Sequence, residues 1–355
     1  MEPLTAGFHH ITMVSGDAGR TVQYYRDLLG IPLIKRTVNY DDPGSYHLYF
    51  GDAHGSPGTL VTFFEWRGQR RGHWGPGGIH HLALGTTDRA AQLRWKRRLQ
   101  DAGVAVSGPY DRKWFHSIYF TDPDGQILEI ATKGPGYAVD EPADALGTSV
   151  IFPGDERIRG HRDETAIAAQ SWREPVPHID DAMRLDGIHH ITGITPDVER
   201  AGEFYASTLG LRLIKKSVNQ DDAGSPHWFW ANYDGAQVAP HSSLTMFGWP
   251  DATSPARAGV GQTHHIAFRA SSDEAQAAWR EHLLGLGVEV SPILDRQYFR
   301  SIYFRAPDGM LLEIATDGPG FAVDEAEADL GRDLKLPDWL EPERDRIARV
   351  LSPLP

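Results

Sequence analysis

The chain has 355 residues, 40% apolar and 23% charged, which is enough for two ordinary globular domains with a sizeable core. Its net charge of -13 argues against nucleic-acid binding, and the absence of Cys excludes disulfides, thiolate zinc sites and thiol catalysis. No apolar run is long enough to cross a bilayer, and the start MEPLTAGFHH has no basic stretch followed by an apolar core, so we expect a cytoplasmic protein without a membrane partner.

Four similar units follow one another along the chain. They open with the strand-like segments FHHITMVSG, IHHLALGTT, IHHITGITP and THHIAFRAS. A helical pattern follows each opening segment, and further strand-like runs come next, joined by a PDG turn at 123–125 and 307–309. Residues 111–141 also agree with residues 295–325 at most positions, so the two halves of the chain repeat each other.

Residues typical of helix ends bound three of the helical patterns. Asp17 is the expected N-cap of the first helix and Gly30 its stop, while Pro196 suits the first turn of the third helix and Gly210 its end. Ser271 and Glu274 have the spacing of a capping box before the fourth helix. Each unit therefore reads β-α-β-β-β.

The predicted fold class is α+β, with four βαβββ modules paired into two half-open barrels, because a single module leaves one sheet face bare. The predicted organisation is 1–141 with modules at 7–68 and 77–132, a polar connector at 142–186, 187–325 with modules at 187–249 and 262–316, and a C-terminal tail at 326–355. The residues leave open whether the first module pairs with the second or with the fourth.

The histidines and glutamates on these strands are residue types that commonly bind metal ions. Neighbouring side chains on a strand point to opposite faces, so only one His of each HH pair can face a barrel cavity. Glu129 in ILEIAT and Glu313 in LLEIAT lie among apolar residues, whereas the matching strands of the other two modules carry Thr62 and Thr245. Either pairing of modules gives two sets of two His and one Glu. Such a set suits non-haem Fe(II), with Mn(II), Ni(II) or Zn(II) as alternatives.

Each of these residues also has a simpler interpretation. A single buried His is usually a hydrogen-bonded core residue, and Glu129 or Glu313 could instead pair with Arg112 or Arg296. His47 and His227 follow turn-like DDPGS and DDAGS segments, so we interpret them as loop residues or as residues behind the ligands.

The segments HHIT, VNYDDPGSYHLYFGD, THHIAF and DRQYFRSIYFRAPDGMLLEIATDGPGF resemble the vicinal-oxygen-chelate superfamily, and in particular its hydroquinone 1,2-dioxygenases. The resemblance implies metal ligands at His10, His265 and Glu313, and thus pairing of the first module with the fourth. It implies pocket or supporting roles for His9, Thr12, His264, Arg296 and Tyr303. Unlike many members of that family, this chain also offers a candidate second site at His81, Glu129 and His190.

The activity implied by the resemblance is Fe(II)-dependent, extradiol-type cleavage of a hydroquinone- or catechol-type ring with O2, in aromatic compound degradation. Arg296 would hold a substrate oxyanion, His9 or His264 would move protons with near-neutral pKa values, and Tyr303 would orient Glu313 or the oxygen. The alternatives are a glyoxalase-type isomerase or lyase, which commonly uses a fourth protein ligand where Thr62 and Thr245 stand, and a non-catalytic protein that binds small aromatics. The oligomeric state is left open, with a homo-oligomer among the alternatives.

Overall fold

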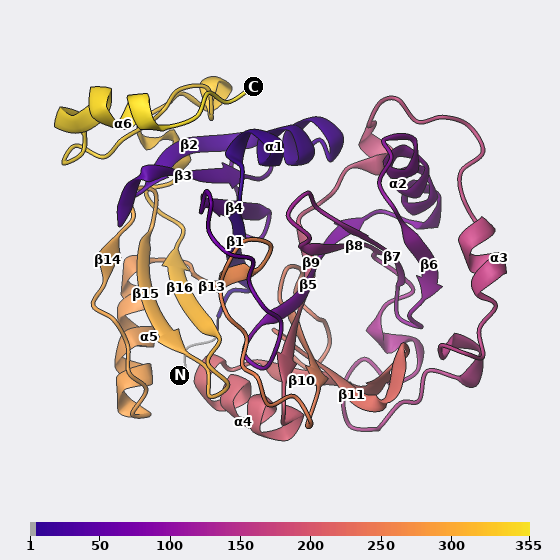
Figure 1. Ribbon diagram of the computed structural model, residues 1–355. Helices are drawn as coiled ribbons and strands as arrows, with labels where there is room; N and C mark the ends of the chain where they lie inside the picture. The colour runs from indigo at the N-terminus through magenta and orange to yellow at the C-terminus, as the bar shows by residue number, and fades with distance from the viewer. Residues whose placement is uncertain (1–4) are drawn as a thin grey trace.

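The first and fourth modules share one eight-stranded sheet in the computed structural model, which describes residues 5–355 (Figure 1). The sheet has the order β14-β15-β16-β13-β1-β4-β3-β2, and its strands are β1 Phe8–Ser15, β2 Leu33–Asn39, β3 Asp42–Phe50, β4 Leu60–Glu65, β13 Thr263–Ala270, β14 Leu294–Asp295, β15 Arg300–Arg305 and β16 Leu311–Thr316. The central strands β1 and β13 run antiparallel, which joins the two ends of the chain.

The second and third modules form the other eight-stranded sheet. Its order is β10-β11-β12-β9-β5-β8-β7-β6, and its strands are β5 Ile79–Thr86, β6 Ser107–Asp111, β7 His116–Thr121, β8 Ile127–Thr132, β9 Ile188–Thr195, β10 Arg212–Asn219, β11 Asp222–Ala231 and β12 Ser243–Gly248. Both sheets curl into half-open barrels that lie side by side in Figure 1. The predicted fold class and the pairing of the first module with the fourth are confirmed.

Helices cover the outer faces of the sheets. Those that follow the opening strands are α1 Ala18–Val22, extended by a π-helical segment at Gln23–Leu28, α2 Arg89–Asp101, α4 Val198–Leu209 and α5 Asp273–Gly285. The connector contains α3 Glu164–Ala169, and the tail contains α6 Arg344–Val350. Among residues 5–355, no helix is long and apolar enough to span a membrane. Residues 1–4, part of the segment that we expected not to be a signal peptide, lie outside the described residues.

The helix ends agree with the sequence at some positions and differ at others. Asp17 caps α1 by accepting from the backbone N–H of Arg20, and Gly210 ends α4 with φ 68°, as predicted. The prediction for Pro196 is wrong, because Asp197 is the N-cap of α4 and Pro196 precedes it. The capping box is also wrong: Ser272, one residue after Ser271, caps α5 by accepting from the backbone N–H of Ala275.

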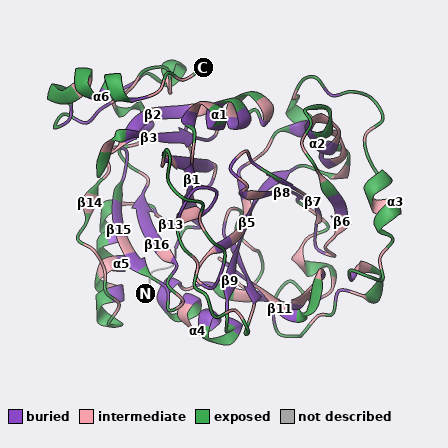
Figure 2. Cartoon of the chain, viewed as in Figure 1, coloured by how far each residue is buried: buried purple, intermediate pink, exposed green. Residues whose placement is uncertain are grey.

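Every residue of β1 is buried, because both faces of this strand are covered. Ile11 and Met13 belong to the hydrophobic core beneath the helices, whereas His10 lines the cavity inside the barrel. The buried strands and the exposed outer residues of α2, α3 and α6 are visible in Figure 2. Alternation along one strand therefore separates a residue set that stabilises the fold from one that faces the cavity.

Candidate metal centre

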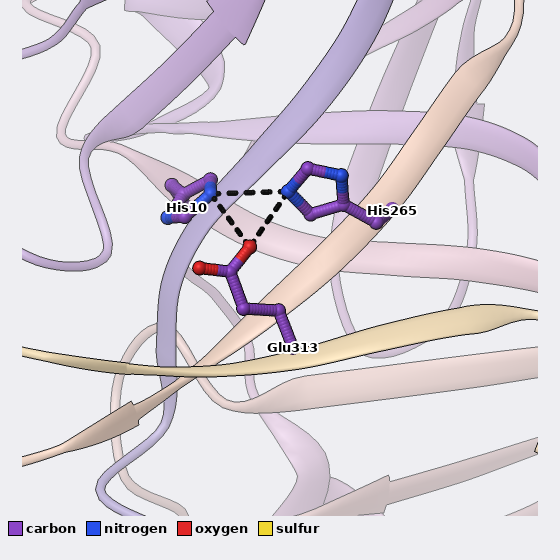
Figure 3. Close-up of side chains that lie close together, drawn as sticks. All are labelled: His10, His265 and Glu313. Atoms are coloured by element: carbon purple, nitrogen blue, oxygen red, sulfur yellow. Dashed lines mark hydrogen bonds and ion pairs between the residues drawn. The ribbon is translucent and has the colours of Figure 1, made fainter. Parts of the chain in front are cut away.

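His10, His265 and Glu313 meet inside the first barrel (Figure 3). They come from the adjacent strands β1, β13 and β16, so the sheet itself fixes their spacing. The Nε2 atoms of His10 and His265 are 3.3 Å apart, and Oε2 of Glu313 lies 3.4 Å from the first and 2.8 Å from the second. All three side chains are at most 4% exposed.

The second barrel contains a matching cluster of His81 on β5, Glu129 on β8 and His190 on β9. The two Nε2 atoms are 3.4 Å apart, and Oε2 of Glu129 lies 3.1 Å from His81 and 3.4 Å from His190. The structure thus brings both predicted residue sets together, each across the two halves of the chain.

Among residues 5–355, one carboxylate oxygen in each cluster has no hydrogen-bond donor. Oε2 of Glu313 and Oε2 of Glu129 are fully buried and unpartnered, an arrangement that is costly unless a cation or a proton satisfies it. Three atoms about 2.1 Å from one ion lie about 3.0 Å apart at right angles and about 3.4 Å apart in a tetrahedron. The observed separations of 2.8–3.4 Å and 3.1–3.4 Å therefore fit a divalent metal ion.

The charge of Glu313 also suits a cation. Burial raises the pKa of this carboxyl, but the adjacent imidazoles of His10 and His265 outweigh burial and hold the pKa well below its usual range. Burial lowers the pKa of His265, partly opposed by Glu313. An ionised carboxylate and a neutral imidazole are the forms in which these side chains bind metals.

The outer histidine of each HH pair lies behind the inner one. The Nδ1 atoms of His9 and His10 are 2.9 Å apart, and those of His264 and His265 are 2.8 Å apart. The near-neutral pKa values expected of His9 and His264 are wrong, because burial and then the neighbouring imidazole lower each to about 3. Neutral outer rings can accept from the inner Nδ1–H, which leaves the inner Nε2 free for a metal.

Serines that the sequence analysis missed contact the glutamates. Ser301 Oγ donates to Glu313 Oε1 at 2.5 Å, and Ser117 Oγ does the same to Glu129 Oε1 at 2.5 Å. Tyr303, which we expected to orient Glu313, lies opposite it on β15 but receives a hydrogen bond from Arg296 instead. The sequence feature that could have revealed these serines is the repeated segment SIYF. It puts Ser and Tyr on the same strand face, two residues apart.

A small pocket of about 30 Å³ opens beside the first cluster. Besides the cluster, it is lined by Asn39, Tyr40, Asp41, His47, Tyr49, Phe64, Arg296, Phe299 and Tyr303. Arg296 and Tyr303 thus line the pocket as expected, whereas His9, Thr12 and His264 lie outside this lining. Thr12 Oγ1 instead lies 2.8 Å from Thr62 Oγ1, behind the cavity wall.

His47 lies on a strand and not in a loop, so the first of the two interpretations given for it, a loop residue, is wrong. It lies on β3, with its Nδ1 2.9 Å from the hydroxyl of Tyr49 and its Nε2 3.2 Å from Thr62 Oγ1. His227 on β11 occupies the same place in the second barrel, 2.9 Å from Thr245 Oγ1. Burial, followed by His10, holds the pKa of His47 well below its usual range, so this pocket imidazole is neutral.

The alternative in which an arginine neutralises each glutamate is wrong. The Nε of Arg296 lies 3.3 Å from the Tyr303 hydroxyl, and its Nη1 lies 3.7 Å from Oδ2 of Asp41. Arg112 bonds Tyr119, Gln220 and Asp221. Within residues 5–355, neither guanidinium forms an ion pair with Glu129 or Glu313, so the carboxylates remain available.

The model of the glyoxalase/bleomycin resistance protein/dioxygenase superfamily matches residues 7–130 and 187–314. The chain belongs to this superfamily. It is 33% identical to "Putative ring-cleaving dioxygenase MhqO" of Bacillus subtilis, over 99% of this chain and 98% of that protein. It is 28% identical to the chlorohydroquinone/hydroquinone 1,2-dioxygenase of Sphingobium indicum, over 98% and 96% of the two chains.

One solved structure is similar to this chain in both fold and sequence. The crystal structure of a Bacillus subtilis protein described as a "putative dioxygenase" matches with a TM-score of 0.77 and 30% identity. The match covers 99% of this chain and 98% of the other. The two half-open barrels and the order of the four modules therefore belong to a known architecture of the superfamily.

Proposed function

We propose that the protein is a non-haem Fe(II)-dependent dioxygenase that cleaves a hydroquinone- or catechol-type ring with O2 in the cytoplasm. The observation that carries this proposal is the cluster of His10, His265 and Glu313, in which a buried carboxylate oxygen without a hydrogen-bond donor among residues 5–355 lies beside a pocket lined by Arg296. The names of the relatives that align over nearly the whole chain support the same reaction.

Iron would be held by His10, His265 and Glu313, and it would supply the redox chemistry and the positive charge that O2 and a phenolate require. Other residues of the protein hold these three ligand side chains in place. His9 and His264 fix the rings of the two inner histidines, and Ser301 fixes the carboxylate, so these three are positioning residues.

Arg296 is the residue best placed to hold the charge of the substrate. Its guanidinium lines the pocket and stands over the ring of Tyr303 at 5.3 Å. Among residues 5–355 its one ion pair is with the exposed Asp41, at 3.7 Å. A fixed planar cation in the pocket wall favours an oxyanion on the ring. Burial raises the pKa of Tyr303, which keeps its hydroxyl protonated and able to donate to the same oxyanion.

His47 is no better a base than His9 or His264, because burial holds its pKa well below its usual range too. It is neutral, it lines the pocket, and it belongs to a hydrogen-bonded chain that runs from Tyr49 through His47 to Thr62 and Thr12. Both ring nitrogens of His47 are bonded to these hydroxyls, so the imidazole positions the pocket wall and is not free to accept a proton from the substrate.

The position of Thr62 argues against a glyoxalase-type isomerase. A fourth protein ligand would have to come from this strand, but Thr62 is bonded to Thr12 and His47 and carries no carboxylate. Thr62 therefore leaves the remaining coordination positions of a metal without a fourth protein ligand, as an oxygen-dependent reaction requires.

Oxygen uptake tests the proposal. Protein loaded anaerobically with Fe(II) is mixed with aerated buffer and a panel of hydroquinones and catechols. We expect oxygen consumption and a ring-opened acid with at least one substituted member. Turnover of methylglyoxal–thiol adducts without oxygen uptake would overturn the proposal in favour of an isomerase, and tight aromatic binding without any turnover would favour a sequestering protein.

A further inference from the structure

The two clusters have the same types of ligand residue, but the residues around them differ. Tyr40 and Tyr49 near the first cluster correspond to Gln220 and Phe229 near the second. The hydroxyl that contacts His47 is therefore missing beside His227, and an amide stands where a phenol stands in the first barrel. Two sites that keep their ligands while the pocket walls differ are built for different molecules.

The connector crosses the second barrel. Val150 bridges Lys216 on the edge strand β10, Arg157 bonds Asp111 on the opposite edge strand β6, and Lys96 holds the carbonyl groups of Ala168 and Gln170 at the end of α3. The C-terminal tail starts in the same way, with Leu334 beside Arg36 on β2, but it then runs back over β3, where the Tyr46 hydroxyl donates to the carbonyl of Ser352. Figure 1 shows α3 beside β6 and α6 above β2 and β3.

A chamber lies between this connector and the second cluster. The inner pocket of about 30 Å³ beside His81 and His190 shares His81, Arg112, Tyr119, Asn219 and Phe247 with an outer chamber of about 680 Å³. The connector contributes Arg159, Gly160, Arg162 and Glu164 to its wall. A chamber of this volume is typical of a ligand site and leaves space beyond a single ring.

The charges of the chamber wall favour an acidic group on the ligand. Arg112 and Arg162 share Asp221 at 3.0 and 2.6 Å, and Arg162 also contacts Glu164 at 2.7 Å. Arg159 is anchored by its backbone N–H to the carbonyl of Gln220, and its exposed side chain stays at the mouth. It adds a positive charge to a protein whose net charge is -13. The inner wall, with Tyr110, Tyr119 and Phe247, suits an aromatic ring.

We propose that His81, Glu129 and His190 form a second metal centre whose ligand is an aromatic ring with an acidic side group, which Arg159 recognises. The proposal rests on the proposed function, because it assigns the same kind of metal chemistry to the second cluster. The buried, unpartnered Oε2 of Glu129 and the hydrogen bond from Ser117 to the other oxygen of that carboxylate are its direct support.

The test uses the variant Glu313→Ala, in which the first cluster has lost its carboxylate. After anaerobic loading with Fe(II), metal analysis is followed by calorimetric titration with 3-(2,5-dihydroxyphenyl)propionate and with its methyl ester. We expect about one ion per chain and about tenfold tighter binding of the acid than of the ester, as a charge-assisted contact predicts. Adding Arg159→Ala should remove that preference, whereas adding Arg173→Ala, an exposed connector arginine outside the chamber, should keep it.

A Glu313→Ala protein that holds no ion would overturn the second centre, and equal affinities for acid and ester would overturn the assigned ligand. So would a preference for the acid that survives Arg159→Ala. Oxygen uptake by the wild-type protein with unsubstituted hydroquinone is measured in parallel. If that uptake occurs while the variant binds neither ion nor acid, the proposed function stands and the inference about the second barrel fails.

Discussion

A serine hydroxyl holds the glutamate of each cluster, and its loss is the smallest change with a defined consequence. Ser301→Ala removes the donor to Glu313 Oε1 and leaves that buried oxygen without a partner. We expect metal affinity at the first cluster to fall about 10–100-fold, as for other groups that orient a metal ligand. Competitive titration with a chelator measures it. Ser117→Ala should produce the same loss at the second cluster only, and an unchanged affinity in both variants would contradict the orienting role.

Arg296 has a different expected effect, because it contacts the pocket and not the cluster. Arg296→Ala should leave the metal content unchanged and weaken the binding of a hydroquinone about 10–100-fold, since a charged hydrogen bond is lost. Arg296→Lys should recover part of the affinity, because the charge remains while the planar fork is lost. Loss of metal from Arg296→Ala would instead indicate that this residue supports Glu313.

At the scale of single elements, the sequence predicted the strands that carry ligands better than the strand that carries His47. The HH and LEIAT segments stand out because polar residues interrupt apolar strands. β3 was missed because its first residues read as a turn. The turn between β2 and β3 consists of residues 40–41 alone, and Asp42 already belongs to β3. Pro and Gly are tolerated near the start of such a strand, so composition alone does not reveal where the turn ends.

A buried lysine ties the segment after β16 to the first barrel. Lys35 on β2 is 0% exposed and forms ion pairs with Asp324, at 2.6 Å, and Glu325. Lys35→Met leaves these carboxylates unpaired, and we expect the free energy of unfolding to fall by about 3–5 kcal/mol. Arg332→Met, which breaks an exposed pair with Asp329, should cost at most about 1 kcal/mol. Equal losses in urea denaturation would contradict the structural role of Lys35.

At the scale of the whole molecule, the residues alone could not decide how the modules pair. Either pairing completes two sets of two His and one Glu, so the ligand count is the same in both. The resemblance favoured the first module with the fourth, and the antiparallel pairing of β1 with β13 confirms it. The connector over the second barrel was also missed, because its polar composition predicts only a link and not the wall of a chamber.

The pairing makes each cluster depend on both halves of the chain, and this leads to the most direct test of the central claim. The metal content of two double variants is compared after anaerobic Fe(II) loading, once circular dichroism has shown that both are folded. His10→Ala with Glu313→Ala damages one cluster twice, so about one ion per chain should remain. His10→Ala with Glu129→Ala damages both clusters, so almost no iron should remain. The opposite result, with iron kept in the second variant and lost from the first, would contradict a metal centre shared by His10 and Glu313.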